Sequence, residues 1–241
     1  MDQVSNWSPM MTNNFITKQI SRTDTNQLIL YVIYFIACSS VTTLVYAWNG
    51  FNTPYYVCLS ITILIIILCT SLYTVRVGNI KQHPIFKSLV KYGEYNSIQY
   101  QINTEVSSSS TIRKEKLLFT NNWILHPYFR GLYIIQRQEL IWVYAKDLAT
   151  RHSINFIPTG TTHTYSIVMN YTEPIPSSGM LCARTLEIKA KDNSGSREVL
   201  EYIIQYAPWI LAGYTKEIAD LWENNTSRVI DFVKNRYKSS T

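Results

Sequence analysis

The amino-acid sequence predicts an α+β protein, in which a transmembrane helical hairpin is followed by a small antiparallel β barrel or sandwich with C-terminal helices. Three observations predict this class. Residues 28–48 and 55–75 are uncharged apolar stretches, residues 114–190 contain short strand-like runs, and residues 197–207 show helical spacing of apolar side chains. The organisation that follows is a polar tail at 1–27, the hairpin at 28–75, a helical linker at 76–111, the β domain with its C-terminal helix at 112–214, and a helical tail at 215–241.

The two apolar stretches predict membrane spans. At about 1.5 Å per residue, each is long enough as a helix to cross the roughly 30 Å of hydrocarbon in a bilayer. Residues 49–54 alone separate them, so the two helices would lie antiparallel and side by side. A pair of buried core helices is the alternative, but two adjacent uncharged stretches of this length are unusual in a soluble domain. We therefore expect a multi-pass protein of the cell membrane.

The charges beside the spans predict the orientation. The connecting loop carries no charge, whereas Lys18 and Arg22 precede the first span and Arg76 and Lys81 follow the second. Cationic flanking residues stay on the cytoplasmic side of a membrane. Both termini are therefore expected in the cytoplasm.

The elements after the hairpin follow from apolar spacing and turn residues. The Pro and Gly of residues 158–160 predict a tight turn between two strands, and the prolines and glycine of 173–179 predict a loop. We expect helices at 84–92, 96–106 and 197–206 and a further one after Thr215, with strands at 116–120, 123–126, 131–135, 139–144, 154–157, 162–169 and 185–189.

No group of residues in the sequence specifies a reaction. The motifs GxSxG, GxxxxGK[ST] and GxGxxG are absent, and His83, His126, His152 and His163 lack metal-ligand spacing. Three of the four cysteines lie in the predicted spans and Cys182 is alone in the β domain, so no disulfide framework or metal site is expected. We expect no catalytic residue, no cofactor and no metal, and therefore no enzyme.

The expected partners are the lipid bilayer and another protein. The formal net charge is +6, but the basic residues after the spans are scattered rather than clustered. A mildly basic domain suits an anionic membrane surface, whereas a nucleic-acid partner would call for a continuous basic patch. We expect no nucleic-acid partner.

Glu139, Trp142 and Tyr144 form the candidate interaction surface. Side chains alternate along a strand, so Trp142 and Tyr144 share one face and the aliphatic residues between and before them share the other. If the aliphatic face is the core, the two aromatic side chains point outward beside Glu139, where they could anchor a partner. Packing beneath the C-terminal helix, with Trp209 as a neighbour, is the alternative.

Several separated motifs carry a resemblance to a known family. They are His83-Pro84, Tyr92-Gly93, Leu118-Phe-Thr-Asn-Asn-Trp-Ile124, Ile141-Trp-Val-Tyr144, Phe156-Ile-Pro-Thr-Gly160 and Ala207-Pro-Trp-Ile-Leu-Ala-Gly-Tyr214. With these, the chain resembles a family of uncharacterised bacterial two-span membrane proteins that have a pleckstrin-homology-like (PH-like) cytoplasmic domain. The resemblance implies a PH-like fold but no assigned activity. The basic pair that binds inositol phosphates in eukaryotic pleckstrin domains is not recognisable after Trp123, where only Arg130 is present.

Two functions are therefore open. The first is a membrane-anchored, non-catalytic protein whose PH-like cytoplasmic domain binds a protein or lipid. The second is an accessory or regulatory subunit of a membrane enzyme complex. Co-purification in mild detergent separates them, because a stoichiometric enzyme partner favours the second.

Overall fold

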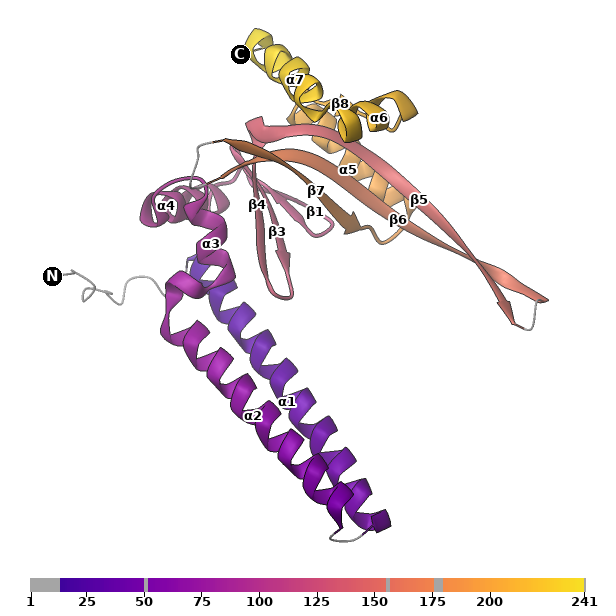
Figure 1. Ribbon diagram of the computed structural model, residues 1–241. Helices are drawn as coiled ribbons and strands as arrows, with labels where there is room; N and C mark the ends of the chain where they lie inside the picture. Colours follow the sequence, from indigo (N-terminus) through magenta and orange to yellow (C-terminus); the bar gives the residue numbers. More distant parts are fainter. Residues whose placement is uncertain (1–13, 50–51, 155–156, 176–179, 241) are drawn as a thin grey trace, which may run out of the picture. The chain divides into compact units, whose positions relative to one another are not determined.

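The structure, a computed structural model, describes residues 14–49, 52–154, 157–175 and 180–240 (Figure 1). The chain divides into two compact units. The first unit comprises Met1–Thr104 and Pro127–Tyr133, and the second comprises Glu105–His126 and Ile134–Thr241. Each unit is described by itself.

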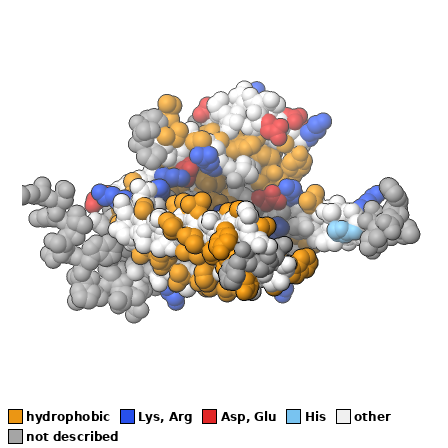
Figure 2. Space-filling model, turned by 60° about the horizontal axis from the view of Figure 1, so that its bottom comes forward, with side chains coloured by type: hydrophobic (Ala, Val, Ile, Leu, Met, Phe, Trp, Pro, Cys, Tyr) orange, Lys and Arg blue, Asp and Glu red, His pale blue; other side chains and the backbone are white. Residues whose placement is uncertain are grey.

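Two long helices dominate the first unit, α1 (Phe15–Asn49) and α2 (Thr53–Gly78). Both contain a segment that is long and apolar enough to cross a membrane. The core helix of a soluble protein is mostly buried. In the most apolar part of these two segments, by contrast, only 6 % of the residues in the first and 0 % in the second are buried. Hydrophobic side chains accordingly gather on the surface of the hairpin (Figure 2). The antiparallel hairpin predicted from the sequence is confirmed, and its outward apolar surface suits contact with lipid.

The first helix begins earlier than the sequence predicted. Residues 1–27 were expected to form a polar tail, but α1 already begins at Phe15. Ile16, Gln19 and Thr23 lie on one face of this first part of the helix and are buried. The backbone N–H of Ile16 donates to Oδ1 of Asn103 at 3.0 Å. Residues 1–13 lie outside the described part of the chain.

Short helices follow α2 in the first unit: η2 (Ile80–Gln82), α3 (Pro84–Val90) and α4 (Tyr95–Val106). His83 caps α3, because its Nδ1 accepts the backbone N–H of Ile85 at 3.2 Å. That contact leaves the proton of the neutral ring on Nε2, which lies 3.4 Å from Oδ1 of Asp24 in α1. This pair could not be predicted from the sequence, because Asp24 is far from His83 along the chain.

One sheet has the order β1-β2-β3-β4, with β1 (Ile112–Lys114), β2 (Leu117–Phe119), β3 (Trp123–Tyr128) and β4 (Gly131–Gln136). The pairs β1–β2 and β2–β3 are antiparallel. Leu117, Phe119 and Ile124 of this sheet are buried in the core of the second unit. The tip of the β3–β4 hairpin belongs to the first unit, where Nδ2 of Asn26 donates to the carbonyl of Phe129 at 3.2 Å.

The other sheet has the order β7-β6-β5-β8, with β5 (Leu140–Ile154), β6 (Ile157–Pro174), β7 (Leu181–Lys189) and β8 (Leu211–Ala212). The short 3-10 helix η3 (Arg137–Glu139) precedes β5. β5, β6 and β7 are antiparallel, and β8 runs parallel to β5. The predicted strands are thus arranged in two open sheets. The closed barrel that we considered from the sequence is not formed by the described strands, because β1–β4 and β5–β8 pair only within their own sheets.

Three helices complete the second unit: α5 (Asn193–Tyr206), α6 (Lys216–Asn224) and α7 (Thr226–Ser240). Asp192 caps α5, because its Oδ1 accepts the backbone N–H of Gly195 at 2.7 Å. α5 packs against β5 and β6, and α7 packs against β5. Val229 and Val233 of α7 are buried in the core. The C-terminal segment is therefore a docked helix and an integral part of the second unit.

Candidate functional site

Trp142 lies inside the second unit, where its side chain is 2 % exposed. Its indole Nε1 donates to the carbonyl of Gly213 at 2.7 Å. Its ring centroid lies 4.6 Å from that of Tyr144 and 6.5 Å from that of Trp222 in α6. Of the two placements that the sequence left open, the structure thus has Trp142 packed near a C-terminal helix. The neighbouring tryptophan is Trp222 of α6, and not Trp209, which follows α5 in the chain.

Tyr144 marks the border between this aromatic cluster and the surface. Its side chain is partly exposed, and its ring centroid lies 5.2 Å from that of Tyr214, which is itself exposed. Partial burial raises the pKa of the Tyr144 phenol above its ordinary value. A partner could therefore reach the rims of Tyr144 and Tyr214, but it could not reach Trp142.

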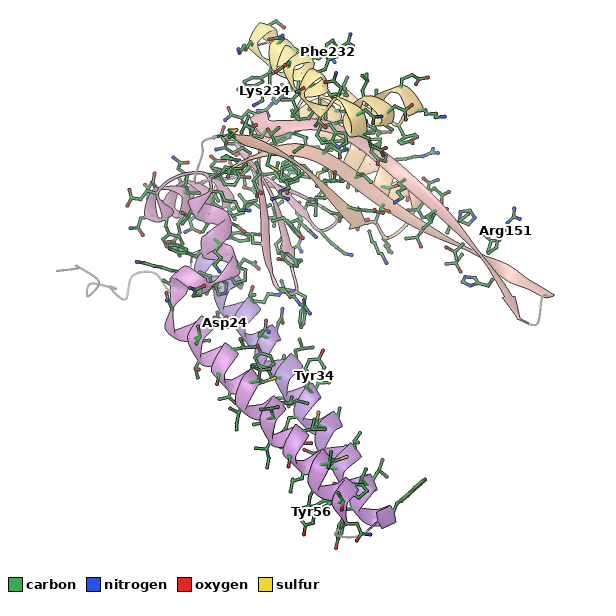
Figure 3. The ribbon with its side chains drawn as sticks, in the orientation of Figure 1. Asp24, Tyr34, Tyr56, Arg151, Phe232 and Lys234 are labelled. Carbon is green, nitrogen blue, oxygen red and sulfur yellow. The ribbon has the colours of Figure 1, made fainter. Side chains whose placement is uncertain are left out.

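Glu139 is engaged inside the second unit and is 13 % exposed. Its carboxylate lies 3.2 Å from Nζ of Lys234 in α7 and also accepts a hydrogen bond from the hydroxyl of Thr172. Lys234 is labelled on α7 in Figure 3. The ion pair links α7 to the segment that precedes β5. The three residues proposed from the sequence thus have different environments, and among them Tyr144 retains an exposed portion.

The most exposed part of the β structure is a two-stranded extension of β5 and β6 (Figure 1). β8 pairs with β5 only at Trp142 and Val143, and β7 pairs with β6 only from Ser166 onward. The pairing between β5 and β6 nevertheless continues as far as Ile154 opposite Ile157. We call residues 147–154 and 157–165 the β5–β6 arm. Residues 147–152 and 160–163 are all exposed, so neither face of the arm is covered there.

The predicted turn at residues 158–160 lies within β6. Pro158 pairs with Ser153 and Gly160 pairs with His152, and the register shifts between these two pairs. Gly160 has a φ of +149°, a conformation that L side chains rarely adopt, and a β-bulge accommodates it. The prediction of a turn at residues 158–160 is therefore wrong, because β6 already begins at Ile157. Residues 155–156 lie outside the described part of the chain.

The arm carries polar and charged side chains. Nδ1 of His163 lies 3.0 Å from Oδ1 of Asp147, and Nε2 of His152 lies 2.9 Å from the hydroxyl of Thr162. The side chain of Arg151 extends away from the arm (Figure 3), and within the described residues it makes no hydrogen bond or ion pair. The arm therefore offers a guanidinium group that no described residue of the chain neutralises.

The outer edge of β5 is open along the arm. The backbone N–H of Gly213 donates to the carbonyl of Val143 at 2.9 Å, so the backbone groups of Val143 point toward this edge. Backbone direction alternates along a strand, and β5 has no register shift between Trp142 and His152. Ala145, Asp147, Ala149 and Arg151 therefore direct their backbone N–H and carbonyl groups outward. No described strand pairs with them on that side.

The described residues contain no group of three or more His, Cys, Asp or Glu side chains that could hold a metal ion. His126 lies on β3 as predicted, and its Nδ1 is 3.2 Å from the carbonyl of Lys116. Burial lowers the pKa of His126 below its ordinary value. This histidine is therefore biased toward its neutral form, and its Nδ1 lies beside a backbone carbonyl.

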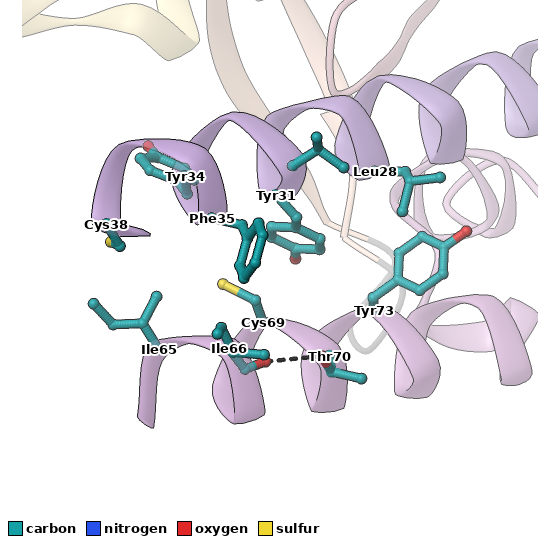
Figure 4. Close-up of a pocket in the computed structure, with 11 residues that line it drawn as sticks. Leu28, Tyr31, Tyr34, Phe35, Cys38, Ile65, Ile66, Cys69, Thr70 and Tyr73 are labelled. Carbon is teal, nitrogen blue, oxygen red and sulfur yellow. Dashed lines mark hydrogen bonds between the residues drawn. The ribbon is translucent and has the colours of Figure 1, made fainter. Parts of the chain in front are cut away.

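The hairpin has an apolar groove of about 260 Å³ between α1 and α2 (Figure 4). Tyr31 and Tyr73 meet there with their rings edge to face, and Cys38 and Cys69 line the same groove. Closer to the connecting loop, the hydroxyls of Thr42 and Thr62 are 3.0 Å apart. Small residues and hydroxyl pairs of this kind hold helices together in a membrane. The groove lining contains no acidic or basic side chain, so we interpret it as a helix-packing feature.

The comparisons with known proteins identify a family. Residues 79–222 match a family model described as a domain of unknown function (DUF6709). The chain belongs to the DUF6709 family. The DUF6709 match includes both sheets and the whole β5–β6 arm, whereas α1 and α2 precede it. The match confirms the part of the resemblance that placed the chain in an uncharacterised family. Neither the curated proteins nor the solved structures gave a match.

Proposed function

We propose that the protein is a membrane-anchored, non-catalytic interaction protein whose β5–β6 arm binds a protein partner. The hairpin would hold the chain in the cell membrane with both termini in the cytoplasm. The second unit would present the arm to the partner, without a cofactor and without nucleic acid. The observation that carries the proposal is the open edge of β5 along an arm that is exposed on both faces.

An exposed two-stranded ribbon gains little stability by itself. An isolated hairpin in water is marginally stable at best, because it has no buried face. An open strand edge also presents unpaired N–H and carbonyl groups, which are a template for another strand. Each backbone hydrogen bond that a partner strand forms would contribute about 0.5–1.5 kcal/mol net. Strand addition would thus stabilise the arm and recognise the partner through the same groups.

Site-specific photo-cross-linking tests this function. We expect a photoreactive amino acid at Leu148 or Thr150 to give a discrete protein adduct in membranes of cells that make the full chain. The same group at Tyr100, which is exposed on α4 of the first unit, is the control and should not give this adduct.

A proline on the open edge provides the matched variant. Ala149 directs its N–H outward, so Ala149→Pro removes a donor for the partner and leaves the bonds between β5 and β6 in place. We expect this variant to lose the adduct. Three results would contradict the proposal: no protein adduct at the arm, adducts with lipid only, or an adduct that Ala149→Pro does not change. Lipid adducts alone would instead support the headgroup-binding role that a PH-like domain implies.

A further inference from the structure

We propose that the partner of the β5–β6 arm is a second copy of this chain, with the two β5 strands paired antiparallel about a two-fold axis at Ala149. The inference rests on the proposed function and names its partner. Such an interface is isologous, because the same edge of each copy contacts its equivalent in the other.

The charge pattern of β5 favours this register. When Ala149 lies opposite Ala149 of the second copy, Asp147 lies opposite Arg151 of that copy, and the symmetry produces this pair twice. Opposite charges that face each other across an antiparallel pair attract, and like charges in that position repel. Arg151 makes no ion pair within the described residues, so its guanidinium group is available for this contact.

The backbone geometry permits the same register. Asp147, Ala149 and Arg151 all direct their N–H and carbonyl groups toward the open edge, as inferred from the bond between Gly213 and Val143. Each of the facing residues can therefore exchange both backbone hydrogen bonds with its opposite. Ala149 has the smallest side chain of the three and lies on the axis, where two copies approach each other.

Neighbouring registers are less favourable. Centring the pair on Asp147 or on Arg151 would place two like charges face to face. Centring it on Leu148 would bring together two leucine side chains that are each 52 % exposed, but it would leave Asp147 opposite alanine. The Leu148 register is therefore the main competitor, and the experiment must separate it from the Ala149 register.

Disulfide formation identifies the residue on the axis. The experiment uses the full chain in proteoliposomes, with Cys38, Cys58, Cys69 and Cys182 replaced by alanine. Directly opposite residues in an antiparallel pair lie about 5.5 Å apart at Cα when hydrogen bonded, within the range of a disulfide. We expect Ala149→Cys to form a disulfide-linked dimer on mild oxidation. Thr161→Cys, exposed on β6 and so a strand further from the axis, is the matched control and should remain monomeric.

Charge reversal tests the two ion pairs. Asp147→Arg places two arginines opposite each other, and Arg151→Asp places two aspartates opposite each other. Either change should reduce the dimer that Ala149→Cys traps by about tenfold or more. An equimolar mixture of the two variants should restore the dimer, because arginine at 147 then faces aspartate at 151. His163→Ala removes the partner of Asp147 within its own copy and should leave the dimer unchanged.

Three results would overturn the inference. One is a dimer yield that neither charge reversal changes, and another is a mixture that fails to restore the dimer. The third is more efficient linkage through Leu148→Cys than through Ala149→Cys. If no self-linkage occurs while the adduct at Leu148 or Thr150 still depends on Ala149, the partner is another protein and the proposed function stands. If both signals are absent, both proposals fail.

Discussion

Replacing Trp142 by alanine should destabilise the second unit by about 3–5 kcal/mol, the range for truncation of a buried large aromatic side chain. The indole is buried among Tyr144, Tyr214 and Trp222, and it donates to the carbonyl of Gly213. The truncation leaves a cavity and removes the donor to this carbonyl. Urea denaturation of the full chain in detergent, followed by limited proteolysis of the second unit, measures the change.

Two further variants show whether packing or the hydrogen bond carries the effect. Trp142→Phe keeps an aromatic ring but loses the Nε1 donor, so we expect a loss of about 1–3 kcal/mol. Tyr214→Ala removes a ring that is largely exposed, and we expect it to cost less than Trp142→Ala. A Trp142→Ala protein with unchanged stability would contradict the packed placement and restore Trp142 as a candidate surface anchor.

Val233→Asp should destabilise the second unit by roughly 3–5 kcal/mol, because it leaves an uncompensated charge on the buried face of α7. Val233 is 1 % exposed and belongs to the core of the unit. The change therefore tests whether the C-terminal helix is part of the fold. Proteolytic release of the segment after residue 225 and the urea midpoint of the full chain are the two measurements.

Phe232→Asp is the matched control for Val233→Asp. Phe232 is adjacent in the chain but lies on the outer face of α7 (Figure 3), where it is 54 % exposed and its ring contacts Arg236. Loss of an exposed cation–π contact costs about 0.5–1 kcal/mol. Equal effects of the two substitutions would show that α7 does not pack against the core as described.

The hairpin could be predicted from the sequence because a lipid-facing helix is apolar on all sides. The first part of α1 could not be, because its buried face consists of Ile16, Gln19 and Thr23, and only one of these is apolar. The buried polar side chains are accommodated by local contacts, such as the bond from the Thr23 hydroxyl to the carbonyl of Gln19. This part of the sequence therefore lacks a helical repeat of apolar side chains, although one face of the helix is buried.

The arm was missed for a related reason. Residues 145–153 were not predicted as strand because they do not alternate between apolar and polar side chains. Alternation reflects one buried face, and neither face of the arm is buried. The Pro and Gly of residues 158–160 then directed the prediction toward a turn, whereas the structure uses Gly160 in a bulge within β6.

The candidate surface depended on contacts that strand alternation does not encode. Strand alternation correctly predicted that Trp142 and Val143 lie on opposite faces of β5. Both residues are nevertheless buried, because core elements cover both faces of β5 at this point. α6 brings Trp222 to Trp142, and α7 brings Lys234 to Glu139. These contacts join residues far apart along the chain. The sequence could therefore identify the residues but could not decide which of them are exposed.

Cysteine accessibility tests most directly whether the hairpin anchors the chain with its second unit in the cytoplasm. Asn52 lies at the start of α2 beside the connecting loop, and Ser109 is exposed in the second unit. In a variant without the natural cysteines, we expect Asn52→Cys to react with a membrane-impermeant maleimide in intact cells. Ser109→Cys should react only after the membrane has been permeabilised. Labelling of Ser109→Cys in intact cells, with Asn52→Cys protected, would contradict both the orientation and the cytoplasmic placement of the arm.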